Sequence, residues 1–188
     1  MGQDKALLRH PQGGTWLEHS LQQLAQLGAP VTLLSRHHQH LALAQALHSP
    51  NISALAEPPP WEGPLLALSR LMQSHPDQLL LLCPVDMPHL TLASLRTLLA
   101  EASTKPAAIH LAHDGWQLQP LLGVYPSDAE RRAALNSSIG RGERRLQSWL
   151  ATQPCRTVPL PAAGLRNINR PSELDGLRDA RHLTPPAD

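Results

Sequence analysis

The sequence lacks the features that mark several large classes of protein. Its 188 residues include no phenylalanine, and aromatic residues make up only 3% of the chain, so leucine and alanine have to fill the core. The two cysteines, Cys83 and Cys155, lie far apart in the sequence and fit no zinc-binding spacing. We therefore expect free thiols in a reducing compartment.

Neither sign of charge is in large excess. The 16 lysine and arginine residues against 15 aspartate and glutamate residues give a formal net charge of +1, which provides no broad positive surface for nucleic acid. No run approaches the roughly 20 apolar residues that span a bilayer, and the chain opens without a charged and then apolar leader. We expect a cytoplasmic protein with neither nucleic acid nor membrane among its partners.

Hydrophobic residues make up 41% of the chain, and their spacing predicts alternating helices and strands. The expected helices are 15–28, 38–49, 63–75 and 91–103, and the strands between them are 30–35, 52–57 and 78–84. Such alternation is typical of a three-layer α/β fold with a mostly parallel sheet. The later pattern predicts strands 107–113, 118–126 and 155–160, and helices near 127–136, 142–151 and 171–181. We expect one domain over 1–181 and a frayed tail over 182–188.

Polar residues that could carry chemistry stand next to the predicted strands and helices. In open α/β sheets, ligands bind beyond the carboxyl ends of the strands. Asp86 follows the most apolar strand, Glu57 and Gly63 follow the strand before it, and Lys5 precedes the first helix. A carboxylate with a lysine nearby suits Mg²⁺ and phosphate, because Mg²⁺ binds few carboxylates and otherwise takes water and phosphate oxygens. The alternatives are an Asx turn at Asp86 and a solvated Lys5.

Two later motifs could bind an anionic ligand. GRGERRL (140–146) combines two glycines with Arg144 and Arg145, and its alternative role is a solvated basic face at the start of a helix. NIN (167–169) places Asn167 and Asn169 on the same side of an extended chain, where each amide can donate and accept hydrogen bonds. A turn before the last helix is the alternative for this second motif.

Other conspicuous residues are expected to have only structural roles. HHQH (37–40) is predicted to be a solvated helix face, since neither cysteine nor carboxylate lies nearby in the sequence to complete a metal site. Cys83 lies within an apolar strand and is expected in the core. The sequence contains no P-loop and no G-x-G-x-x-G motif, and no Ser-His-Asp or Cys-His constellation is expected.

Taken in order, these segments resemble a known family. MGQDKALL, GPLLAL, CPVDMPHL, QPLLGVY, GRGERRLQSWL and NINRPSEL occur in the order found in molybdenum cofactor guanylyltransferases, the MobA-type nucleotidyltransferases. The resemblance implies a Rossmann-like nucleotidyltransferase fold. It also implies transfer of GMP from GTP to molybdopterin with Mg²⁺ and release of pyrophosphate, and molybdoenzyme-maturation proteins as further partners.

The resemblance also implies roles for particular residues. Lys5 would hold the GTP phosphates, and Asp86 would coordinate Mg²⁺ and orient the α-phosphate, which makes these two the implied catalytic residues. Glu57 and Gly63 would contribute to the nucleotide site. The implied residues of the molybdopterin side are Pro120, Arg144, Arg145, Asn167 and Asn169.

The start of the chain departs from the family pattern. The family loop reads LAGG-x-S-x-R-M-G-x-D-K after a first apolar strand, and this sequence begins at the Met-Gly of that loop. In the 3-2-1-4 strand order of such sheets the first strand is central. We therefore expect this strand to be missing from the chain and its two neighbours to have unpaired edges.

Two other interpretations remain open. One is a related transferase that uses CTP or another acceptor. Its metal loop usually has glutamine before the proline, whereas Met87 precedes Pro88 here, and this difference favours GTP. The other is a truncated fragment without catalysis.

Overall fold

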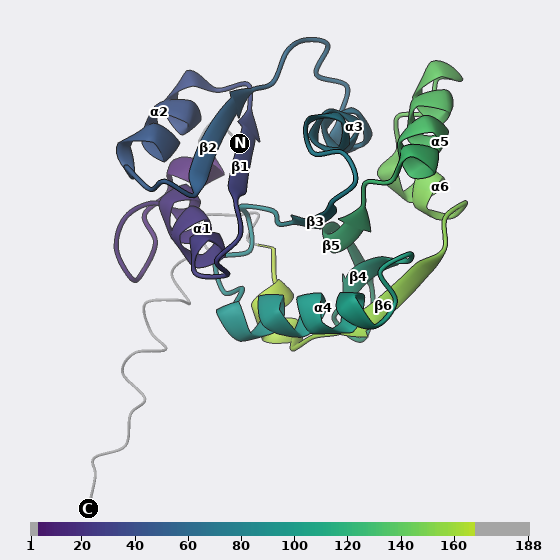
Figure 1. Ribbon diagram of the computed structural model, residues 1–188. Coiled ribbons are helices and arrows are strands. Elements are labelled where there is room, and N and C mark those ends of the chain that lie inside the picture. Colours follow the sequence, from purple (N-terminus) through teal and green to yellow (C-terminus); the bar gives the residue numbers. More distant parts are fainter. Residues whose placement is uncertain (1–3, 168–188) are drawn as a thin grey trace, which may run out of the picture.

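The strands form two separate sheets, and the break between them organises the rest of the fold (Figure 1). The computed structural model describes residues 4–167. In the smaller sheet, β1 (Val31–Ser35) pairs in parallel with β2 (Ile52–Ala56). The larger sheet has the order β3-β5-β4-β6, with bounds Leu79–Leu82, Leu118–Pro126, Ile109–His113 and Cys155–Pro159 in that order.

Three of the four strands of the larger sheet run in one direction. β4 is parallel to β6, and both β3 and β4 are antiparallel to β5, so β5 alone is reversed. The strands predicted over 107–113 and 118–126 are confirmed, and they pair with each other. Gly123 permits the close approach of β5 to β4, because a Cβ at this position would lie 2.7 Å from the carbonyl oxygen of His110.

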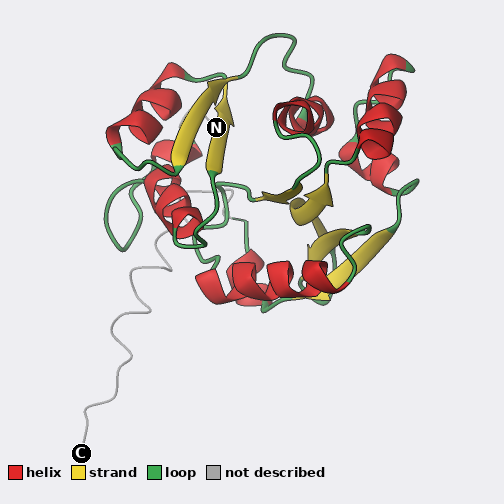
Figure 2. Cartoon of the chain, viewed as in Figure 1, coloured by secondary structure: helices red, strands yellow, loops and turns green. Residues whose placement is uncertain are grey.

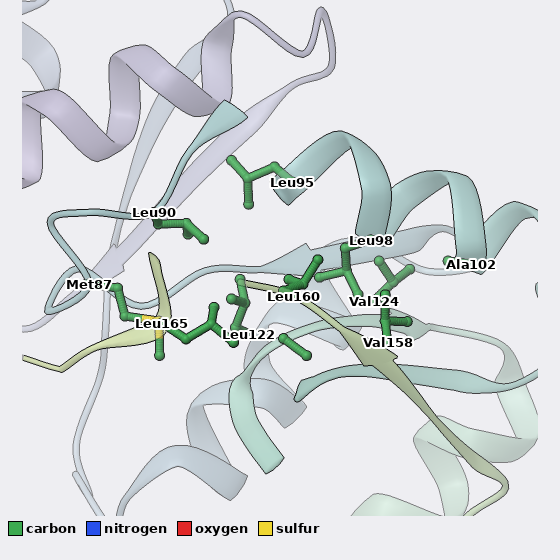
Figure 3. Close-up of a cluster of buried hydrophobic side chains, with 11 residues drawn as sticks. Met87, Leu90, Leu95, Leu98, Ala102, Leu122, Val124, Val158, Leu160 and Leu165 are labelled. Atoms are coloured by element: carbon green, nitrogen blue, oxygen red, sulfur yellow. The ribbon is translucent and has the colours of Figure 1, made fainter. Parts of the chain in front are cut away.

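Helices cover both faces of the larger sheet, as the predicted three layers require (Figure 2). One face packs against α4 (Leu92–Thr104), in a cluster that includes Leu95, Leu98, Val124 and Val158 (Figure 3). The other face packs against three helices: α3 (Pro64–Ser74), α5 (Ala129–Gly140) and α6 (Leu146–Leu150). Within residues 4–167, no helix is long and apolar enough to cross a membrane.

The smaller sheet has a core of its own. The 3₁₀ turn η1 (Lys5–Leu7) and the helices α1 (Trp16–Ala25) and α2 (His38–Ala46) pack against β1. α1 begins with a reciprocal cap. Thr15 Oγ1 accepts from the backbone N–H of Glu18 at 3.2 Å, and Glu18 Oε2 accepts from the backbone N–H of Thr15 at 2.6 Å. Local sequence therefore sets where α1 starts.

The helices and strands predicted up to residue 160 are confirmed, with ends that differ by a few residues. The strand predicted over 78–84 is shorter than expected, and 46% of Leu79 at its start is exposed. The physical reason is that β3 is an edge strand. The helix predicted at 171–181 and the tail at 182–188 lie outside the described residues, and the domain limits stay a prediction.

Both strands beside the break have an unpaired edge. Among the described residues, β1 pairs only with β2 and β3 pairs only with β5. Two strands with open edges are the arrangement that the sequence led us to expect. An unpaired edge exposes backbone N–H and C=O groups to any other extended chain, so it favours self-association.

A lysine on the open edge of β3 should reduce such self-association. We expect Leu79→Lys to lower the aggregated fraction in light scattering and to change the free energy of unfolding by less than about 0.5 kcal/mol, because the side chain is half exposed. The control is Leu81→Lys, two residues along the same strand, where the leucine packs on the α4 cluster. That variant should lose about 2 kcal/mol or more. Unchanged aggregation of Leu79→Lys would contradict the account.

Candidate active site

The two residues expected to do the chemistry lie side by side. Lys5 is the first residue of η1, and Asp86 lies in the loop that follows β3. The Nζ atom of Lys5 is 3.9 Å from Oδ2 of Asp86, and both side chains are partly exposed. A cation and a carboxylate thus share a solvent-accessible position at the end of a strand, which is what binding of a phosphate and a metal ion requires.

A line of hydrogen bonds joins this pair to the end of β1. Asp4 Oδ2 lies 2.7 Å from Nε2 of His40, and Nδ1 of His40 lies 2.9 Å from Oγ of Ser35. In a neutral imidazole one nitrogen donates and the other accepts. Because a carboxylate only accepts, Nε2 of His40 donates to Asp4, and in the neutral imidazole Nδ1 then accepts from the Ser35 hydroxyl. The line fixes Asp4, and with it the neighbouring Lys5, against the smaller sheet.

This line corrects two expectations from the sequence. His40 is buried rather than part of a solvated helix face, because α2 packs that side of the helix on β1. Ser35, His40 and Asp4 do form a Ser-His-Asp line, in which Asp4 and His40 are 36 positions apart. Ser35 is nevertheless buried, and its hydroxyl also accepts from the backbone N–H of His37. The line therefore stabilises the backbone around Ser35, and the hydroxyl is not exposed as a nucleophile.

Cys83 is not available as a nucleophile either. Its side chain packs against the α4 cluster. Burial, with a smaller contribution from the nearby Asp86 carboxylate, raises the pKa of the Cys83 thiol to about 12. Since the thiolate is the reactive form, the prediction of a core role for Cys83 is confirmed.

Glu57 holds the loop that follows β2. Its Oε1 atom accepts from Nη1 of Arg70 at 2.6 Å, and Nη2 of Arg70 donates to the carbonyl oxygen of Pro60 at 2.9 Å. The loop ends at Gly63, whose φ of +98° is unfavourable for other residues, and α3 then begins at Pro64. Glu57 is thus already paired, and its contribution to a nucleotide site stays a prediction.

The two arginines of the GERR segment make different contacts. Arg144 Nε lies 2.5 Å from Oε2 of Glu62, so Arg144 ties this segment to the loop before α3. The Glu143 carboxylate accepts from the backbone N–H groups of Arg145 and Arg144 at 2.7 and 2.8 Å, and these bonds lower the pKa of Glu143. Within residues 4–167, the guanidinium of Arg145 forms no hydrogen bond and no close ion pair, although its charge also lowers the pKa of Glu143. Arg145 is therefore the better placed of the two to bind an anion.

Two other predicted residues lie on the Asp86 side of the larger sheet. β5 is antiparallel to β3 with Gly123 opposite Leu82, so Pro120 lies on the part of β5 that extends past the end of β3. Asn167 is exposed and follows η2 (Ala162–Leu165). That turn packs on the loop after Asp86, since a Cβ on Gly164 would lie 3.4 Å from the carbonyl oxygen of His89. Asn169 lies outside the described residues.

An open cavity of about 440 Å³ lies beside the same loop. It is lined in part by His10, His19 and His89, with the rings of His10 and His19 stacked 3.7 Å apart. Burial lowers the pKa of His19 and of His89, and His10 lowers both further. No signal in the sequence indicated this cavity, because its wall combines three separate segments.

The donor set suits a metal that takes most of its ligands from elsewhere. Residues 4–167 contain no group of three or more histidine, cysteine, aspartate or glutamate side chains arranged to hold a metal ion. Asp86 offers one partly exposed carboxylate. One carboxylate, completed by water and substrate phosphate, fits Mg²⁺ and does not fit a structural zinc site.

Known proteins are similar to this chain in sequence and in fold. A probable molybdenum cofactor guanylyltransferase from Rhodopirellula baltica is 36% identical over 186 residues, covering 93% of this chain and 83% of that protein. One from Mycobacterium tuberculosis is 32% identical over 179 residues, covering 93% and 85%. The solved structure of molybdopterin-guanine dinucleotide biosynthesis protein A from Archaeoglobus fulgidus has a TM-score of 0.72 at 15% identity, covering 96% of this chain and 91% of that one.

A second solved structure extends the likeness of fold beyond that protein. The structure of CMP:2-keto-3-deoxy-manno-octonic acid synthetase complexed with CTP has a TM-score of 0.71 at 16% identity, covering 94% of this chain and 91% of that one. The fold is therefore the Rossmann-like fold of nucleotidyltransferases. The family model of the MobA-like NTP transferase domain matches residues 1–158. With that match and the close relatives, this chain belongs to the family of MobA-like NTP transferases.

Proposed function

We propose that this enzyme transfers GMP from GTP to molybdopterin and releases pyrophosphate. The observation that carries the proposal is the approach of Lys5 Nζ to Asp86 Oδ2 at 3.9 Å, at the strand end where α/β folds bind ligands. The substrates follow from the relatives, which bear the name molybdenum cofactor guanylyltransferase. We expect the reaction to take place in the cytoplasm and the product to pass to molybdoenzyme-maturation proteins.

The chemistry needs positioning and charge neutralisation more than acid–base groups. A phosphate oxygen of the acceptor attacks the α-phosphorus of GTP, and the bond from that phosphorus to the bridging oxygen breaks, so pyrophosphate leaves with the electron pair. Lys5 neutralises charge on the triphosphate as a point cation. The nucleophile is already anionic, so no general base is required, and the protonated Cys83 and buried Ser35 are compatible with that.

We infer that Asp86 is the protein ligand of Mg²⁺. The ion would supply positive charge for the phosphates when it is bound, and Asp86 would fix its place relative to Lys5. Arg145 would bind the phosphate of the acceptor, because its guanidinium is exposed and forms no ion pair among the described residues. Pro120 and Asn167 would complete the acceptor side.

Removal of the Asp86 charge should lower turnover. We expect Asp86→Asn to fold normally and to reduce the rate of pyrophosphate release from GTP and molybdopterin by about a hundredfold or more, because metal alignment of the α-phosphate is lost. The matched control is Asp77→Asn, at an exposed carboxylate paired with Arg132. Guanylyl transfer by Asp86→Asn at the rate of the Asp77→Asn control would exclude the metal role.

The two arginines of GERR should behave differently. Arg145→Ala should raise the KM for molybdopterin by roughly 10- to 100-fold, which corresponds to loss of a charge-assisted hydrogen bond of about 1.5–3 kcal/mol, and should leave the Kd for GTP unchanged. Arg144→Ala removes the contact with Glu62 and should weaken the binding of molybdopterin and of GTP to a similar, smaller extent. An equal loss of both ligands in Arg145→Ala would contradict the acceptor role.

A further inference from the structure

An aromatic ring is held at the surface of the loop between β2 and α3. The side chain of Trp61 is 52% exposed, although tryptophan side chains are mostly buried in folded proteins. Its Nε1–H donates to the carbonyl oxygen of Glu57 at 3.0 Å, and the guanidinium carbon of Arg36 lies 5.4 Å from the ring centroid. These contacts orient the ring and leave about half of its surface open.

The loop that carries Trp61 is fixed at both ends. Arg70, from α3, bonds to the Glu57 carboxylate and to the carbonyl oxygen of Pro60. At the other end Glu62 pairs with Arg144. The ring is therefore ordered before any ligand arrives, and a ligand that stacks on it loses little further conformational entropy.

Trp61 lies at the same edge of the smaller sheet as the line that leads to Lys5. β1 and β2 are parallel, and the backbone N–H of Glu57 donates to the carbonyl oxygen of Ser35 at 2.9 Å, so both strands end together. Arg36 follows Ser35 directly. From Ser35, hydrogen bonds run through His40 to Asp4, the residue before Lys5, and Lys5 lies beside Asp86. The exposed ring of Trp61 and the Lys5–Asp86 pair thus lie at opposite ends of a line of residues linked by hydrogen bonds and by the chain itself.

A nucleotide has the same arrangement, with a flat base at one end and phosphates at the other. We propose that Trp61 stacks on the base of the nucleoside triphosphate and that Arg36, over the indole, keeps the ring in place. This inference rests on the proposed function, because it assumes that the phosphates occupy the Lys5–Asp86 pair. A purine offers a larger surface for stacking than a pyrimidine does, so Trp61 contributes to the preference for GTP over CTP.

The chain contains a matched control residue. Trp116 is 93% exposed, in the turn between β4 and β5. Its indole has no ring contact or hydrogen bond within residues 4–167. Loss of either tryptophan removes a similar exposed ring, so a difference between the two variants reports on position.

The experiment titrates the full chain and three variants, Trp61→Ala, Trp61→Phe and Trp116→Ala, with GTP, CTP and inorganic tripolyphosphate in the presence of Mg²⁺. Binding is followed by calorimetry. We expect Trp61→Ala to raise the Kd for GTP by roughly 10- to 100-fold, the usual effect of removing one base-stacking side chain. Its Kd for CTP should rise less, and its Kd for tripolyphosphate should not change. Trp61→Phe should recover most of the affinity, and Trp116→Ala should match the unmodified chain.

Three results would overturn the proposal, and they are distinguishable. If the unmodified chain binds GTP and Trp61→Ala binds it equally well, stacking is wrong and the proposed function stands. If the affinity of Trp61→Ala for GTP and for tripolyphosphate falls to the same extent, the residue acts through the structure of the loop. If the unmodified chain binds neither GTP nor tripolyphosphate, the proposed function fails and the stacking role fails with it.

Discussion

The candidate site depends on the carboxylate of Asp4. Its Oδ1 atom accepts from the backbone N–H of Ala6 at 3.0 Å and so starts the η1 turn, while Oδ2 bonds to the buried His40. One side chain thereby fixes both the conformation of the segment that carries Lys5 and its attachment to β1. Since Lys5 has a long and flexible side chain, its charge can be kept near Asp86 only if its backbone is held in this way.

The acids around the site have separate tasks. Glu57 and Glu62 are paired with Arg70 and Arg144, and Glu143 accepts from the backbone of its own loop. These carboxylates order the loops that carry the proposed binding residues. Asp86 differs, because its ion-pair partner Lys5 stands at 3.9 Å, beyond hydrogen-bond distance. A carboxylate that is near a cation and loosely paired can still bind a metal ion, and our proposal for Asp86 rests on this.

The Lys5–Asp86 pair lies where the two sheets meet. η1 belongs to the core of the smaller sheet through Ala6, whereas Asp86 follows β3 of the larger sheet, and Val85 beside it packs on the core of the smaller one. The position of the pair therefore depends on how the two sheets pack against each other, although β1 and β3 share no backbone hydrogen bonds. Side-chain packing, to which Val85 contributes, joins the two sheets where their strands do not pair.

The sequence by itself determined the helices and strands, the α/β class and the family. Apolar periodicity and caps such as Thr15 are local signals, and motifs such as those around Lys5 and Asp86 keep their order along the chain. Only the tertiary structure decided what surrounds those residues. It buried His40 against Ser35 and Asp4, paired Glu57 with Arg70, and left the ring of Trp61 exposed. The contacts of His40 with Asp4 and of Glu57 with Arg70 join residues 36 and 13 positions apart. No periodicity or local propensity encodes which distant side chain will meet a given polar group.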